Sequence, residues 1–114
     1  MGTDGGDGMT NLGILSGTIS DNKAIVLDED AKGSNAPYLF GSVYNAGTSA
    51  ITLKVNINTK RGTNAANIPL VAGQGIEFKG LQIHSIQCLN TSPNLNYVFS
   101  VVEIEGELVG ETRY

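Results

Sequence analysis

The chain of 114 residues has few of the side chains that catalytic and metal sites use most. It contains one cysteine, one histidine and no tryptophan. A single cysteine excludes an internal disulfide. Together the cysteine and the histidine give two ligands, too few for a zinc site, which takes three or four. Jelly-roll metalloenzymes of the cupin type use several histidines, so that class is excluded as well.

Basic residues and long apolar runs are also scarce. Seven Lys and Arg stand against eleven Asp and Glu, a net charge of −4, and only Lys60 and Arg61 form an adjacent basic pair. So little positive charge argues against a nucleic-acid partner. No apolar run approaches the ~20 residues of a membrane span, and residues 1–9 lack the basic and apolar regions of a signal peptide. We therefore expect no membrane partner, and synthesis and assembly in the cytosol.

What the chain does contain is strict alternation of apolar and polar residues. From position 51 to 58 the apolar members are Ile51, Leu53, Val55 and Ile57, and the polar members are Thr52, Lys54, Asn56 and Asn58. This period of two is typical of half-buried strands. Similar runs predict strands near 13–20, 23–28, 37–45, 50–58, 67–71, 75–83, 84–90 and 96–106. The sequence thus predicts an all-β, antiparallel, jelly-roll-like β-sandwich of about eight strands.

Two regions differ from this pattern. Residues 1–11, MGTDGGDGMTN, hold four glycines and little that could be buried, which predicts a flexible arm before a sandwich domain over 12–114. Two longer loops are expected at 29–36 and 59–67, where variable function would lie. The segment 45–49 reads as a hairpin loop in which Gly47 adopts a positive φ.

The run from Ile76 to Cys88 changes phase twice. Its inward candidates shift by one position after residue 78 and again after residue 83, and a shift of one residue reverses the facing of a strand. Bulges near Gly80 and Ser85 would bring all of them inward. Curved strands of this kind are typical of barrels and jelly-roll corners.

The candidate catalytic and metal residues do not form a site. His84 and Cys88 would lie roughly 13 Å apart along a strand, too far for a nucleophile and its base, so they are interpreted as a surface imidazole and a buried thiol. Asp28, Glu29 and Asp30 form the densest acidic cluster; such a loop could hold calcium, but its spacing is not that of an EF-hand and solvation explains it. We expect no cofactor and no enzymatic activity.

Three aromatic residues share one phase of a strand: Tyr38, Phe40 and Tyr44. They could form a platform for stacking on sugar rings, or an ordinary core stripe. Because the chain has only seven aromatic residues, the core is the favoured interpretation. The positions considered for partner binding are Asp4, Asp7, Met9, Tyr38, Tyr44, Lys60 and Arg61.

Two segments resemble small virion proteins of tailed phages. One runs from Ile68 through Phe78 into Lys79–Ile86, with a strand, an Ala-Gly-Gln turn, an alternating strand and a Leu-x-x-Ile run; the other is the hairpin-like Val43–Leu53. The resemblance implies a capsid decoration, head-fibre or tail-associated module with no catalytic residues. It implies contact with a major capsid protein or another virion protein, assembly in the host cytoplasm and location in the virion.

The chain is also expected to form a homo-oligomer, with a trimer favoured by analogy with decoration proteins at threefold positions. The alternative function is a carbohydrate-binding or adhesion module that uses the aromatic stripe or the loops, with a glycan as its partner.

Overall fold

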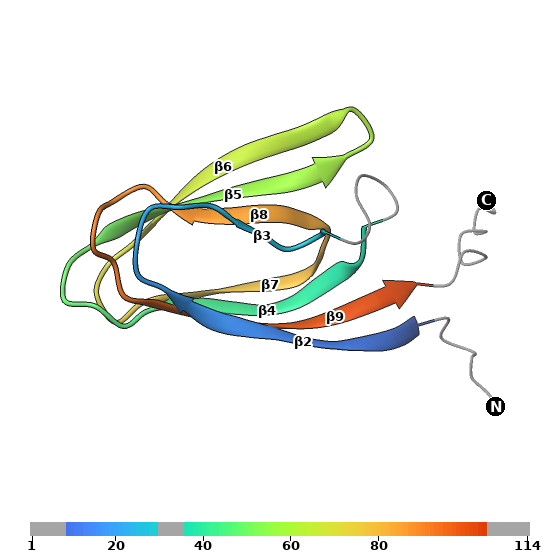
Figure 1. Ribbon diagram of the computed structural model, residues 1–114, viewed down its shortest axis with the longest axis horizontal. Coiled ribbons are helices and arrows are strands. Elements are labelled where there is room, and N and C mark those ends of the chain that lie inside the picture. Colours follow the sequence, from blue (N-terminus) through green and yellow to red (C-terminus); the bar gives the residue numbers. More distant parts are fainter. Residues whose placement is uncertain (1–8, 30–35, 105–114) are drawn as a thin grey trace.

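The computed structural model describes residues 9–29 and 36–104, and within them the chain forms two facing antiparallel sheets (Figure 1). One sheet has the order β2-β9-β4-β7 and the other β3-β8-β5-β6. The strands are β2 (Met9–Ile19), β3 (Ile25–Val26), β4 (Tyr38–Asn45), β5 (Ile51–Thr59), β6 (Gly62–Leu70), β7 (Gly75–Leu81), β8 (Ile83–Cys88) and β9 (Leu95–Ile104). The predicted all-β sandwich of eight strands is confirmed.

The strand pairing has a nested order. β5 pairs with β6, β4 with β7, β3 with β8 and β2 with β9, all antiparallel. The chain is therefore one long hairpin whose successive pairs alternate between the two sheets. The pairings β4–β9 and β5–β8 then complete each sheet. This rolled hairpin is the connectivity of a jelly roll.

The core lies between the two sheets. Phe99 on β9 is fully buried, and its ring centroid lies 6.0 Å from that of Phe78 and 6.2 Å from that of Tyr97. Leu39 from one sheet and Leu53 from the other are also fully buried in this core. Cys88 belongs to the same cluster, which confirms the interpretation of a buried thiol.

Two bulges correct the phase of the β7–β8 segment, as predicted. Gly80 has no partner in the β4–β7 pairing, where Leu39 pairs with Leu81 and the next pair skips one residue, and its φ is +74°. His84 is skipped in the same way between β5 and β8. The second bulge is therefore one residue before the expected Ser85. Ile83 and Ile86 consequently both reach the core.

Two local expectations were wrong. The segment 59–67 was expected to be a loop, but β6 occupies most of it. The expectation failed because this edge strand is exposed on both faces from Gly62 to Asn67 and needs no apolar alternation. The segment 45–49 is not a hairpin, since it joins β4 to β5 in the opposite sheet, and Gly47 is not among the residues with positive φ. β2 starts at Met9, inside the expected arm; the rest of that arm and most of the loop 29–36 lie outside the described residues.

Gly41 on β4 is predicted to be intolerant of any side chain. A Cβ atom built there would lie 1.9 Å from the backbone oxygen of Val98 and 2.7 Å from Cα of Phe99 on β9. These backbone atoms of β9 cannot move aside as the end of a flexible side chain can. Gly41→Ala should therefore force β4 and β9 apart and lower the free energy of unfolding by about 2–3 kcal/mol. Gly75→Ala is the control, because its nearest contacts are 3.4 Å away. Denaturant unfolding of both variants measures the difference; equal stability would contradict the close approach.

Candidate interaction surface

The outward face of the β2-β9-β4-β7 sheet carries a regular grid of side chains. Strand alternation turns Leu39, Val43 and Phe99 inward, so their neighbours in sequence point outward. The strand registers align these neighbours in three rows across the sheet. The rows, in strand order, are Ile14–Ser100–Phe40–Lys79, Ser16–Val98–Ser42–Glu77, and Thr18–Asn96–Tyr44–Gly75.

This outward face exposes large apolar side chains and carries few charges. Ile14 is 68% exposed, Val98 47%, Tyr44 44% and Phe40 37%. Only Glu77 and Lys79 are charged at neutral pH within the three rows. Contiguous exposed apolar side chains with few charges are typical of surfaces that contact other macromolecules.

The aromatic residues of this face cover glycines of the neighbouring strand. A Cβ at Gly80 would lie 3.1 Å from Cζ of Phe40, and a Cβ at Gly75 would lie 3.4 Å from Cδ1 of Tyr44. The preferred interpretation of Tyr38, Phe40 and Tyr44 as core residues was therefore wrong for Phe40 and Tyr44, which face outward, while Tyr38 is half-buried. Both phases of β4 are apolar, so the alternation alone did not decide which one faces the core.

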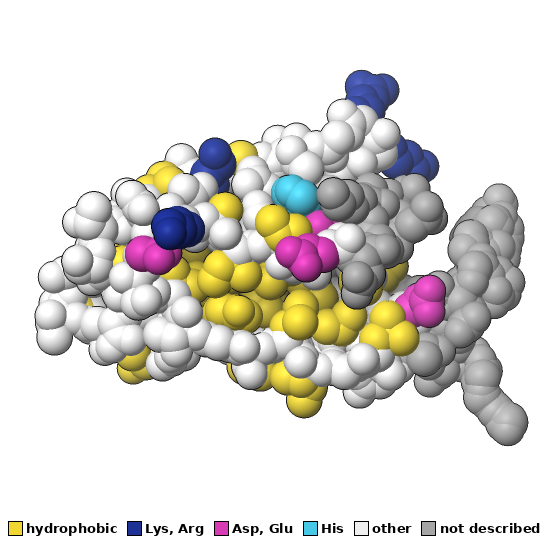
Figure 2. Space-filling model, in the orientation of Figure 1, with side chains coloured by type: hydrophobic (Ala, Val, Ile, Leu, Met, Phe, Trp, Pro, Cys, Tyr) yellow, Lys and Arg dark blue, Asp and Glu magenta, His cyan; other side chains and the backbone are white. Residues whose placement is uncertain are grey.

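A second apolar feature lies along one open side of the sandwich. Figure 2 shows hydrophobic side chains between the edges of the two sheets, where β2 and β3 lie in Figure 1. A groove of about 250 Å³ opens there, lined mainly by Leu12, Leu15, Leu27, Pro37 and Val101. Because β3 has only two residues, it covers little of this side.

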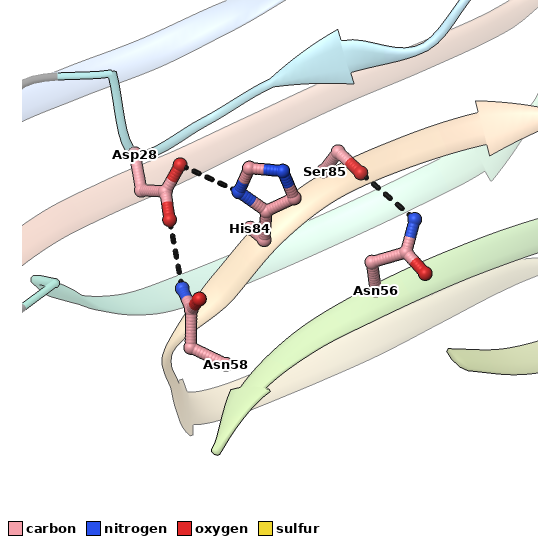
Figure 3. A network of polar contacts seen from close by, with 5 residues as sticks. All are labelled: Asp28, Asn56, Asn58, His84 and Ser85. Carbon is pink, nitrogen blue, oxygen red and sulfur yellow. Dashed lines mark hydrogen bonds and ion pairs between the residues drawn. The ribbon is translucent and has the colours of Figure 1, made fainter. Parts of the chain in front are cut away.

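A polar network lies on the other sheet, around a buried carboxylate (Figure 3). Asp28 follows β3 and is only 2% exposed. Its Oδ1 lies 2.8 Å from Nδ1 of His84, and its Oδ2 accepts a 2.8 Å hydrogen bond from Nδ2 of Asn58. The bulge at His84 turns the imidazole toward Asp28. Nothing in the sequence indicates this pair, because Asp28 and His84 are 56 residues apart.

The Asp28–His84 pair supplies only part of a catalytic triad. An ionised carboxylate only accepts hydrogen bonds, so Nδ1 of His84 carries the proton and Nε2 is left without one when the imidazole is neutral. Ser85 is adjacent, but its hydroxyl accepts a 2.9 Å hydrogen bond from Nδ2 of Asn56. Among the described residues no hydroxyl or thiol is bonded to Nε2 of His84. The pair is therefore best explained as a structural link between β3, β5 and β8.

The loops at one end of the sandwich enclose a polar cup of about 530 Å³. Two of the three asparagines that line it are used by the fold. Asn45 is fully buried; its Nδ2 donates to the carbonyls of Ser49 and Leu70, and its Oδ1 accepts from the amide of Gly47. Oδ1 of Asn90 accepts from the amide of Thr52. These amide groups hold the loops and are not free for a ligand.

The other positions considered for partner binding do not form a cluster. Lys60 and Arg61 are exposed at the turn between β5 and β6. Met9 begins β2, whereas Asp4 and Asp7 lie outside the described residues. Of the acidic cluster proposed for calcium, Asp28 is bonded within the protein, and no group of three metal-ligating side chains occurs in the part of the chain that the structure describes. Nor does that part contain a helix long and apolar enough to span a membrane.

Comparison with known proteins supports the fold alone. No family model matches the sequence, and no curated protein matches it. A chain from a solved structure of Bacillus endospore appendages, described as a novel family of disulfide-linked pili, is similar with a TM-score of 0.54 and 13% identity. The match covers 85% of this chain and 92% of that chain. The likeness is thus to a β protein of an extended structural assembly, and the relation to phage modules stays a prediction.

Removing the buried carboxylate should destabilise the fold. In Asp28→Ala the donors on Asn58 and His84 lose their acceptor in a mostly buried setting, which costs about 1–3 kcal/mol of unfolding free energy. Glu77→Ala is the matched control, because Glu77 is exposed and should change stability by less than about 0.5 kcal/mol. Denaturant titration of both variants provides the measurement. If Asp28→Ala were as stable as the control, the network would have no structural role.

Proposed function

We propose that this chain is a non-enzymatic structural subunit that acts through surface contacts in a larger assembly. The observation that carries the proposal is the outward face of the β2-β9-β4-β7 sheet. Four large apolar side chains are exposed there, on three different strands. Exposed apolar side chains grouped on one face are typical of surfaces that contact other macromolecules.

The chemistry of the described residues supports the same proposal. The single imidazole is bound to a buried carboxylate, and the single thiol is fully buried. The likeness in fold to a chain of a bacterial pilus is compatible with a structural role. That appendage is described as disulfide-linked. Since Cys88 is the only cysteine in these 114 residues and is 0% exposed, copies of this chain would be held by noncovalent contacts.

The finer form of the proposal is a module that coats a viral shell. It is supported by the sequence resemblance of the segments around Val43–Leu53 and Ile68–Ile86 to tailed-phage virion proteins. Co-sedimentation of the purified chain with expanded capsids tests this form. Assembly of the chain alone into filaments would favour an appendage subunit instead.

A second candidate function is glycan binding, and one observation favours it. Phe40 and Tyr44 are exposed on one face and could stack on sugar rings. A glycan-array signal that disappears in Tyr44→Ala, with the stability unchanged, would support this function. The absence of any signal for the native chain would leave the aromatic rings to protein contacts.

A charge placed on the outward face should weaken self-association. Val98→Asp is expected to raise the dissociation constant at least ~10-fold, because it buries a carboxylate in an apolar contact. Val71→Asp is the matched control: Val71 is 59% exposed, like Val98 at 47%, but lies outside the face. Sedimentation velocity over a concentration series measures both, with circular dichroism to verify the fold. Equal effects of the two variants would contradict a role for this face.

A further inference from the structure

The sizes of the side chains on the outward face alternate between neighbouring strands. In each of its three rows, a large side chain on β4 lies beside a smaller one on β9, or the reverse. The pairs are Phe40 with Ser100, Val98 with Ser42, and Tyr44 with Asn96. Large positions on one strand are thus matched by small positions on the next, which is the condition for a surface to fit a copy of itself.

From this arrangement we infer that the face binds a second copy of the same chain, with a two-fold axis running parallel to the strands between β4 and β9. The inference rests on the proposed function and names its partner. Such an axis places β4 of one copy over β9 of the other and keeps each row opposite itself. Phe40 then faces Ser100 of the other copy, and Val98 faces Ser42. On β4 and β9 each protruding side chain thus meets a smaller one, and the sheets pack in the aligned manner usual for β-sandwiches.

The charges of the face favour the same axis. Under it, Glu77 lies opposite Ser16 of the other copy and can accept its hydroxyl hydrogen bond. Lys79 lies opposite Ile14, which its aliphatic stem can cover. A two-fold axis perpendicular to the strands, along the middle row, would instead set Glu77 against Glu77 and Val98 against Val98. Like charges that face each other across a contact are unfavourable.

Net charge explains why this face and not another would meet a copy. The chain carries −4 overall, so two copies repel each other. The three rows hold one acid, Glu77, and one base, Lys79, so the face itself is neutral. Contact through it therefore brings no excess of one charge together.

The size of the face sets the strength of the contact. Four strands at ~4.8 Å spacing and three rows, or about six residues at ~3.3 Å each, give roughly 19 by 20 Å, so two copies bury on the order of 800 Å². Stable interfaces begin above that area. The pair is therefore weak alone and is reinforced by further contacts in an assembly.

Cross-linking between single-cysteine positions tests the axis. Facing sheets lie ~10 Å apart, beyond the ~4.4–6.8 Å between Cα atoms in a disulfide, so a short bismaleimide is the reagent. Ser16→Cys carrying an affinity tag is mixed with untagged Glu77→Cys; the fully buried Cys88 is left in place. These exposed positions lie on the outer strands of the sheet, so the axis sets the mixed pair ~10 Å apart and like positions ~17 Å apart. The mixed product should exceed either self-linked product several-fold. Asn67→Cys, exposed on β6 of the other sheet, is the control and should not link to Ser16→Cys.

The outcomes separate this inference from the proposed function. A dominant mixed product supports the axis parallel to the strands. Self-linking of Glu77→Cys as efficient as the mixed reaction overturns it in favour of the perpendicular axis. Assembly of the native chain without any cross-link on this face overturns the inference and leaves the structural function intact. A native chain that stays monomeric at every concentration and does not co-sediment with expanded capsids, with both variants shown to be folded by circular dichroism, overturns both.

Discussion

The bulges at Gly80 and His84 decide which side chains of this protein face the core and which face outward. In a strand that alternates without interruption, Phe78 and Ile86 would face one side and Ile83 the other. The three side chains, all buried here, could then not reach the core together. The two skipped residues restore the inward facing on both sides of the corner between the sheets. The same skipped residues also shape the surface: Gly80 leaves room for the ring of Phe40, and His84 is turned out of the ladder toward Asp28.

A sandwich this small leaves apolar surface exposed. The inner face of the β2-β9-β4-β7 sheet packs on the core, but its outer face exposes four large apolar side chains to water. The side of the sandwich between β2 and β3 is covered by a strand of only two residues. Both features cost solubility in an isolated chain and are offset when another molecule covers them. The opposite sheet is different. Its outer face is polar, and its network around Asp28 and Asn58 is satisfied within the fold. The two sheets thus differ, with internal polar links on one and exposed apolar side chains on the other.

The sequence predicted the fold well where one phase of a strand was clearly apolar. The alternation at Ile51–Ile57 gave β5, and the phase changes gave both bulges to within one residue. It failed at β6, whose exposed residues need no apolar alternation, and at β4, where Leu39 and Val43 compete with Phe40 and Tyr44 for the core. That choice depends on which strands flank β4, and pairing between β4 and β9 joins residues fifty or more positions apart. The outward face of the β2-β9-β4-β7 sheet could not be predicted for the same reason, since it is assembled from four strands that are not consecutive in the chain.

The connectivity makes the outward face depend on the stability of the whole molecule. β4 and β9 lie at the centre of their sheet, so the face is supported by paired strands on both sides rather than by an exposed edge. Gly41 allows the backbones of β4 and β9 to approach closely, because a Cβ there would overlap the Val98 carbonyl. Phe40, Ser42 and Val98 therefore lie on paired strands beside this close approach. A surface fixed in this way loses little conformational freedom on contact, which is what a small neutral interface needs in order to bind at all.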